Sequence, residues 1–181
     1  MKKSYYLYAA LFIYAIIFYL PCSFDKDNFN LIEKELKTHS KQFNKPKYAI
    51  VIDYSKPFFK KRLWVVDINS KETILNSHVS HAKNSGWFWA TEFSNVVGSE
   101  YSSKGTFKTL NSYESKHGKG IYKIGMRIKG LNKGVNDNVL KRNIVFHTSY
   151  GFWSAGCFMT APKTNKKIID LTKNGHILIV I

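Results

Sequence analysis

The chain has 181 residues, enough for one domain with a buried core and short appendages. Apolar residues make up 44% of it and aromatic residues 15%, which excludes a wholly disordered protein. There are 28 lysines and arginines against 12 acidic residues, so the net charge is +16 and the surface favours anionic surroundings such as nucleic acid, phospholipid headgroups or cell-wall polymers.

Residues 1–21 have the pattern of an export signal. Two lysines follow Met1, residues 5–20 form an uncharged apolar run, and Pro21 and Cys22 precede a charged stretch. The run is slightly short for a membrane span, so both a signal peptide and a signal anchor remain open, with a buried helix as the alternative. We predict an exported protein of the periplasm or cell envelope that meets the membrane only through this segment, with inner-membrane anchoring as one form.

Residues 22–46 are predicted to be a linker that contains a short amphipathic helix. Phe29, Ile32 and Leu36 are spaced like one face of a helix, and Asn28 is a candidate N-cap. Pro46 ends this stretch, and the sequence pattern changes after it. We therefore place the main folded domain at residues 47–181.

The domain is predicted to be mainly β. Strands are expected at 48–53, 62–67 and 73–79, joined by short turns as a meander. Further strands are expected at 105–110, 121–129, 144–147 and 175–181, with a short helix at 166–172. Short strands, glycine-rich turns and one or two short helices favour a β-sandwich or β-barrel.

The candidate chemistry lies at His147 and Cys157. His147 ends an apolar strand, and Gly156 before Cys157 permits a tight turn that presents a sulfur together with backbone N–H groups. Acyl transfer needs a thiolate, a base and donors for an oxyanion, which these residues provide. Taken alone, Cys157 fits equally well as a small buried apolar residue. The histidines share no metal-ligand spacing with it, so no metal site is predicted.

An ordered set of motifs gives these residues a context. From residue 48 onward the chain resembles the catalytic domain of L,D-transpeptidases, particularly the branch of murein L,D-transpeptidase catalytic domain proteins. The matching stretches are 48–57, 78–86, Phe93-Ser94-Asn95, Gly98-Ser99, Ser102-Ser103, Gly105, Gly130-Leu131, 136–138, Arg142, 144–147 and the Ser154-Ala155-Gly156-Cys157 run.

The resemblance implies a role for individual residues. Cys157 is the implied nucleophile and His147 its base, Ser154 shapes the turn, and the N–H groups of Gly156 and Cys157 are oxyanion donors. His81 is expected either to contact substrate or to hold structure by hydrogen bonds. We also expect Tyr150 and Trp153 to bind substrate. The short interval between His147 and Cys157, Met159 in place of a frequent arginine, and Ala155 in place of a larger residue depart from the family pattern.

The implied reaction is acyl transfer on peptidoglycan stem peptides through a Cys157 thioester, with release of D-alanine and no cofactor. The acyl acceptor is an amine of a neighbouring stem or of an envelope protein, or water, which would make the enzyme an L,D-carboxypeptidase. Two alternatives are a non-catalytic module that binds peptidoglycan and a basic nucleic-acid binder. The export signal counts against the second, so no nucleic-acid partner is predicted.

Overall fold

The computed structural model describes residues 23–116 and 119–181, together with residues 6, 8, 9 and 12. Most of the predicted export segment, 1–21, lies outside the described residues. Within the described part of the chain, no helix combines the length and the apolar character that a bilayer crossing requires.

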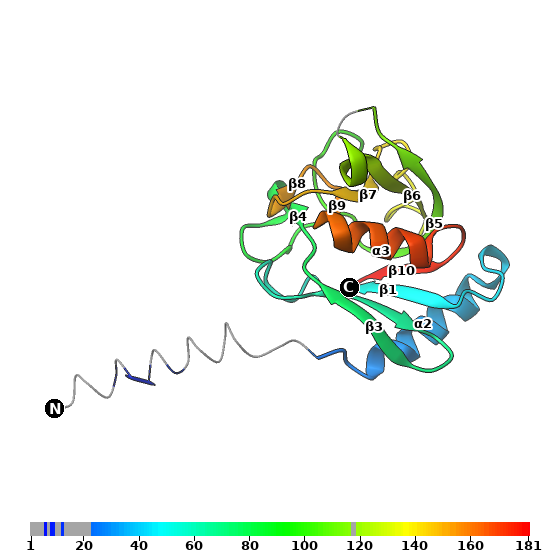
Figure 1. The fold of residues 1–181 in the computed structure, drawn as a ribbon, viewed down its shortest axis with the longest axis horizontal. Coiled ribbons are helices and arrows are strands. Elements are labelled where there is room, and N and C mark those ends of the chain that lie inside the picture. Colours follow the sequence, from blue (N-terminus) through cyan, green and yellow to red (C-terminus); the bar gives the residue numbers. More distant parts are fainter. Residues whose placement is uncertain (1–5, 7, 10–11, 13–22, 117–118) are drawn as a thin grey trace.

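The described domain is mainly β, as predicted (Figure 1). Its strands are β1 (Tyr48–Ile52), β2 (Leu63–Asp67), β3 (Glu72–Ser77), β4 (His81–Ala82), β5 (Gly105–Glu114), β6 (Ile124–Gly130), β7 (Val145–Thr148), β8 (Trp153–Ser154), β9 (Phe158–Thr160) and β10 (Ile177–Val180). Its helices are α2 (Asp27–Thr38) and α3 (Pro162–Thr172), and short 3-10 turns lie at Ser40–Gln42, Lys83–Ser85 and Gly120–Lys123.

Eight strands form one curved sheet in the order β3-β2-β1-β10-β5-β6-β7-β9, and β4 pairs with β8 separately. The predicted meander is confirmed, because β2 lies antiparallel to both β1 and β3. The two edges of the sheet then approach each other. The Ser80 N–H donates to the Met159 carbonyl at 3.0 Å, and the Met159 N–H donates to Ser80 Oγ at 3.1 Å. These bonds tie the segment after β3 to β9, which nearly closes the sheet into a barrel.

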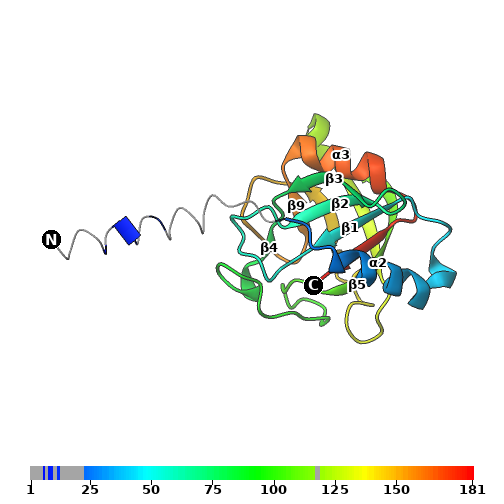
Figure 2. The same cartoon turned by 90° about the horizontal axis from the view of Figure 1, so that it is seen from below.

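Strands β1, β2 and β10 are buried on both faces. On β1, Ile50 and Ile52 pack into the core that also contains Ile168 of α3, whereas Ala49 and Val51 pack into a second core with Ile32 of α2. Figure 2 shows α3 and α2 on opposite sides of the sheet. Because both faces are covered, the sequences of these strands are almost continuously apolar, without the alternation of apolar and polar residues that a half-exposed strand has.

The helix predicted within a linker is part of the folded domain. Ile32 is completely buried, the Phe24 ring lies 5.7 Å from the Trp64 ring, and Thr106 Oγ1 donates to Glu35 Oε2 at 2.6 Å. The helix begins after Lys26, so Asn28 is not its N-cap. The second helix is longer than predicted because Pro162 occupies its first turn, where the missing N–H of proline costs no hydrogen bond.

Candidate active site

The pairing of β7 with β9 brings His147 and Cys157 together. The strands are parallel, with Phe146 opposite Phe158 and His147 opposite Met159. Side chains alternate between the faces of a sheet, so His147, Met159 and the preceding Cys157 share the face opposite to the buried Phe146 and Phe158. Strand spacing and rise place the Cα atoms of His147 and Cys157 roughly 8 Å apart. The two side chains can bridge that gap.

The thiol of Cys157 is half-buried and lies at the start of β9. Its Sγ lies 3.8 Å from the Asn143 carbonyl oxygen, to which the S–H donates. Burial raises the pKa of Cys157, while a hydrogen bond from the Val145 backbone and the positive charge of Arg142 act in the opposite direction. The sulfur is therefore a neutral thiol at neutral pH, and the Val145 backbone and Arg142 are placed to stabilise the thiolate when it forms.

His147 is half-buried beside it. Its Nδ1 lies 3.1 Å from the Thr148 carbonyl oxygen, which assigns the proton to Nδ1 and leaves Nε2 as an acceptor. Burial lowers the pKa of His147, so the ring is neutral near pH 7. A neutral imidazole with a free lone pair is the form that a general base requires. The described side chains show no hydrogen bond between this ring and the sulfur, a contact that often tightens only when substrate binds.

Ser154 and Gly156 shape the turn before Cys157. Gly156 has a φ of +119°, a conformation that favours glycine, and a Cβ on it would lie 3.1 Å from the Tyr101 carbonyl oxygen. The Gly156 N–H donates to Ser154 Oγ at 3.1 Å. The predicted role of Ser154 in shaping the turn is compatible with this hydrogen bond. The Gly156 N–H, predicted as an oxyanion donor, is already engaged, and the Cys157 N–H is the remaining candidate.

Arg142 holds a neighbouring loop against this turn. Its guanidinium donates to the Ser94 carbonyl, to Ser103 Oγ at 2.7 Å and to the Tyr101 carbonyl at 2.6 Å. The same group lies 3.6 Å from where a Cβ of Gly156 would be. A fixed positive charge therefore lies beside Cys157, and the same guanidinium holds the segment 94–103 in place.

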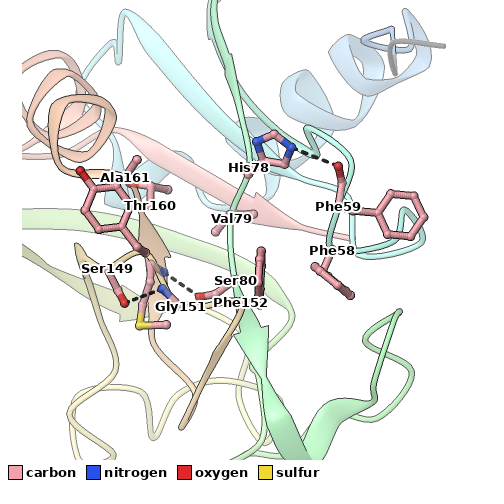
Figure 3. Close-up of a pocket in the computed structure, with 12 residues that line it drawn as sticks. Phe58, Phe59, His78, Val79, Ser80, Ser149, Gly151, Phe152, Thr160 and Ala161 are labelled. Carbon is pink, nitrogen blue, oxygen red and sulfur yellow. Dashed lines mark hydrogen bonds between the residues drawn. The ribbon is translucent and has the colours of Figure 1, made fainter. Parts of the chain in front are cut away.

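A pocket of about 320 Å³ is lined in part by Met159, which lies opposite His147 in the ladder; His147 and Cys157 do not line it themselves. Figure 3 shows its labelled lining residues, with Phe58 and Phe59 on one side and Thr160 and Ala161 on the other. Its remaining lining residues are His78, Val79, Ser80, Ser149, Tyr150, Gly151 and Phe152. The walls are largely apolar and aromatic, with a few hydroxyl groups, as in many sites for organic ligands.

Of the two aromatic residues predicted to bind substrate, one lines this pocket and the other lies beside it. Tyr150 lines it and is 73% exposed. Trp153 packs beside it, with ring centroids 5.6 Å from Phe58 and 4.6 Å from Trp87, and its Nε1 donates to the Trp87 carbonyl at 3.0 Å. A ligand in the pocket would meet Tyr150, whereas Trp153 packs against the Phe58 wall and does not itself line the pocket.

The sequence matches a known protein family. A model of the L,D-transpeptidase catalytic domain family matches residues 23–181. The chain belongs to this family. None of the curated proteins matches the sequence.

Solved structures of three L,D-transpeptidases have a similar fold. That from Stackebrandtia nassauensis is 16% identical over 87% of this chain and 67% of its own, with a TM-score of 0.46. The structure from Xylanimonas cellulosilytica is 13% identical over 83% of this chain and 69% of its own, at 0.49. The Mycobacterium smegmatis enzyme is 15% identical over 75% of this chain and 58% of its own, at 0.45.

His81 does not reach the surface of this L,D-transpeptidase domain. It is completely buried, its Nδ1 accepts from Arg62 at 2.7 Å, and its Nε2 donates to the Gly86 carbonyl at 2.9 Å. With both ring nitrogens occupied, contact with substrate is excluded in this arrangement, and the structural alternative fits. Arg62 is buried too and also donates to the Val79 carbonyl, so the pair fixes the backbone just before Ser80.

Two positions that sequence reasoning left without a chemical role support the site. Arg142 was part of the family pattern, but nothing in its local sequence indicates that its charge faces Cys157. Ser80 donates its hydroxyl to the Cys157 carbonyl at 3.5 Å, and the Tyr54 hydroxyl donates to the Ser80 carbonyl at 2.9 Å. Neither contact leaves a signal in sequence spacing, because the partners are far apart along the chain. Among the described residues, no group of three or more His, Cys, Asp and Glu is arranged to hold a metal ion.

We expect the charge of Arg142 to help the Cys157 thiol ionise. Arg142→Gln removes the cation that lowers the thiol pKa, so the pKa rises and alkylation by iodoacetamide at neutral pH slows. The pH dependence of alkylation measures this, with modification mapped to Cys157 by peptide mass. Arg142→Lys keeps the charge but loses the planar set of donors. If lysine slows alkylation as much as glutamine does, the loop contacts and not the charge are responsible.

We also expect the buried His81 to weaken the fold in acid. Burial lowers its pKa to about 4 from an ordinary value of 6.5, so the unfolded chain takes up a proton that the folded protein refuses. The free energy of unfolding is therefore fully present above pH 6.5 and falls as the pH drops toward 4. Urea titrations across this window should show a steeper decline for the wild type than for His81→Gln. Equal slopes would assign the effect to His147 and His176, whose pKa values are lowered in the same direction.

Proposed function

We propose that the protein is a cysteine acyltransferase that acts on peptidoglycan stem peptides as an L,D-transpeptidase. The observation that carries the proposal is the parallel pairing of β7 with β9, which puts His147 and Cys157 on one accessible face of the sheet. Membership of the family supplies the substrate class. The half-buried thiol, the neutral imidazole and the neighbouring arginine support acyl transfer in particular.

In the first half-reaction, His147 Nε2 removes the proton from the Cys157 thiol as the sulfur attacks the carbonyl carbon of the third stem residue. The carbonyl oxygen becomes an oxyanion, which the Cys157 N–H stabilises. When the bond to nitrogen breaks, the imidazolium returns its proton to the amine of D-alanine, which leaves. A thioester between the third stem residue and Cys157 remains.

In the second half-reaction, an amine attacks the thioester carbon and the sulfur leaves. His147 accepts the proton from the attacking nitrogen and returns one to the sulfur, which restores the starting state. An amine of a neighbouring stem or of an envelope protein gives a cross-link, whereas water gives a carboxypeptidase. The aromatic pocket beside Met159 is the place where the apolar part of a substrate or an acceptor would bind.

One observation favours a second candidate, a peptidoglycan-binding module without catalysis. Burial raises the pKa of Cys157, and a thiol that stays protonated is a poor nucleophile. Such a module would bind isolated sacculi equally well after its thiol is blocked with a maleimide. The raised pKa is compatible with catalysis only if His147 removes the proton during attack.

The proposal includes export to the cell envelope, because the substrate lies outside the cytoplasm. The basic start and the apolar run within residues 1–21 support export. Cell fractionation should find the full chain in the periplasm or the membrane, and a chain that lacks residues 1–21 in the cytoplasm. Intact mass of the exported protein then tells a cleaved signal from a retained anchor. Cytoplasmic full-length protein would contradict export.

Mass spectrometry tests the catalytic proposal directly. Purified protein mixed with tetrapeptide-containing muropeptides should gain the mass of a stem peptide without D-alanine, on the peptide that contains Cys157. Cys157→Ala should gain none, and His147→Gln should acylate about 100-fold more slowly or worse, because general-base catalysis is lost.

The matched control is His176→Gln. His176 is also partly buried but stacks on Tyr48, with ring centroids 5.8 Å apart, and it belongs to a different part of the sheet from the catalytic strands. This variant should acylate at the wild-type rate. Identical behaviour of the wild type and Cys157→Ala would remove the catalytic assignment and leave the binding module.

A further inference from the structure

The face of the sheet that carries the catalytic pair continues across β6 and β5. Arg127 on β6 lies opposite Val145 on β7, and Gly125, two residues earlier, lies opposite Tyr113 on β5. Val145 is two residues before His147, and its backbone contacts the Cys157 sulfur. Alternation of side chains therefore puts Tyr113, Arg127, His147 and Cys157 on the same face.

Tyr113 and Gly125 hold the Arg127 guanidinium in place. A Cβ on Gly125 would lie 2.5 Å from Cζ of Tyr113, so the tyrosine ring occupies the space that the missing side chain leaves. The guanidinium carbon of Arg127 lies 5.0 Å from the centre of that ring. This cation–π contact orients the planar group and reduces the entropy that it would lose on binding a ligand.

Arg127 differs from the other two arginines described above. Arg62 and Arg142 spend their donors on backbone carbonyls and neighbouring side chains. Arg127 is exposed, and within the part of the chain that the structure describes no carboxylate forms an ion pair with it. Its guanidinium is the kind of planar donor group that binds a carboxylate with two parallel hydrogen bonds.

Arg127 lies close enough to act on a ligand bound at Cys157. Two steps of strand spacing separate its Cα from that of Cys157, or roughly 10 Å. The negative charge of the Cys157 thiolate also raises the pKa of Tyr113, after the larger effect of burial, which is consistent with a short separation. A stem peptide that presents its scissile carbonyl to the sulfur carries a free carboxylate only a few bonds further on.

We propose that Arg127, oriented by the Tyr113 ring over Gly125, binds a carboxylate of the acyl-donor stem peptide and so selects and aligns the donor across Cys157. The proposal rests on the function proposed above. Two carboxylates have the right chemistry: that of the terminal D-alanine, and that on the side chain of the third residue where this residue has one. Either would form the same paired hydrogen bonds with the guanidinium.

Equilibrium binding tests this without turnover. Full-length Cys157→Ala protein is titrated by calorimetry with a D-alanine-terminated tetrapeptide, as the free acid and as the C-terminal carboxamide. Adding Arg127→Gln should weaken binding of the free acid roughly 10- to 100-fold, the usual effect of losing a charge-assisted pair. The carboxamide should bind the parent protein equally weakly and should be insensitive to Arg127→Gln. Arg127→Lys should recover part of the affinity.

Lys129→Gln is the matched control. Lys129 is exposed and lies two residues further along β6 on the same face, so its substitution removes the same single charge. In the strand register it lies opposite Lys108 on β5, away from β7 and β9. It should change affinity for the free acid by less than about twofold, since a solvated charge at that distance is screened. Thermal melting of each variant checks that it remains folded.

The outcomes separate the alternatives. If D-alanine amidation has no effect but amidation of the third residue's side chain does, the proposal holds with that carboxylate as ligand. Equal weakening by Arg127→Gln and Lys129→Gln, or no discrimination between acid and amide in either position, overturns it. Failure of the proposed function is a different result: the wild type would form no acyl-enzyme, yet the Cys157→Ala background would still show the dependence on Arg127.

Discussion

The site depends on the parallel register between β7 and β9. Phe146 and Phe158 set this register from the core side, where their rings stack with centroids 5.2 Å apart and planes inclined by 20°. Both rings are fully buried. A shift of either strand by a single residue would turn its own polar side chain, His147 or Cys157, into the core and expose its phenylalanine, which the loss of buried apolar area forbids. The core thus specifies which face the imidazole and the sulfur share.

A second set of contacts fixes the turn from outside the sheet. Ser80 binds Met159 and the Cys157 carbonyl, and the segment before Ser80 is in turn held by the buried Arg62–His81 pair. On the other side, Arg142 joins the Gly156 turn to the loop 94–103. Cys157 therefore lies between two sets of polar contacts whose donors bind backbone carbonyls and neighbouring side chains. Contacts of this kind act over long sequence distances and keep a short, glycine-containing turn in one conformation.

Local sequence patterns predicted most of the secondary structure but little of the pairing. The meander β1-β2-β3 could be predicted because its strands are adjacent in sequence and joined by short turns. The parallel pairing of β1 with β10 joins the two ends of the domain, and no local pattern encodes such a partner. The helix at Asp27–Thr38 was predicted from its periodicity, but its place on the sheet depends on the contacts of Ile32 and Glu35 with distant residues.

The candidate site shows the same division. His147, Cys157, Ser154 and Gly156 were named from a family resemblance, and the structure brings them to one turn and one strand pair. The sequence left His81 open between substrate contact and a structural role because exposure is not encoded in a motif, and its burial against Arg62 fits the structural role. The effect of the Arg142 charge on Cys157 could not be predicted, because the sequence around Arg142 suggests an exposed side chain. A charged residue next to an apolar strand normally points into solvent, and this one is held by carbonyls that lie some forty positions away.

The ionisation of the catalytic pair has a consequence for the proposed reaction. Burial raises the pKa of Cys157 and lowers that of His147, so both shifts favour the neutral thiol and the neutral imidazole over a thiolate–imidazolium pair. The resting thiol is then expected to react only slowly with electrophiles such as iodoacetamide. In the proposed reaction, charge develops on the sulfur and on the imidazole only when the sulfur attacks a bound carbonyl and the thiol proton moves to His147. The Val145 N–H and the Arg142 guanidinium then stabilise the negative charge of the sulfur. Low-dielectric surroundings suppress the thiolate–imidazolium pair at rest. Once the negative charge forms on the sulfur, the same surroundings strengthen its attraction to the Val145 N–H and the Arg142 guanidinium. In the proposed reaction, substrate binding and not a preformed thiolate therefore activates Cys157, which suits a protein whose single described cysteine would face an oxidising compartment in the proposed location.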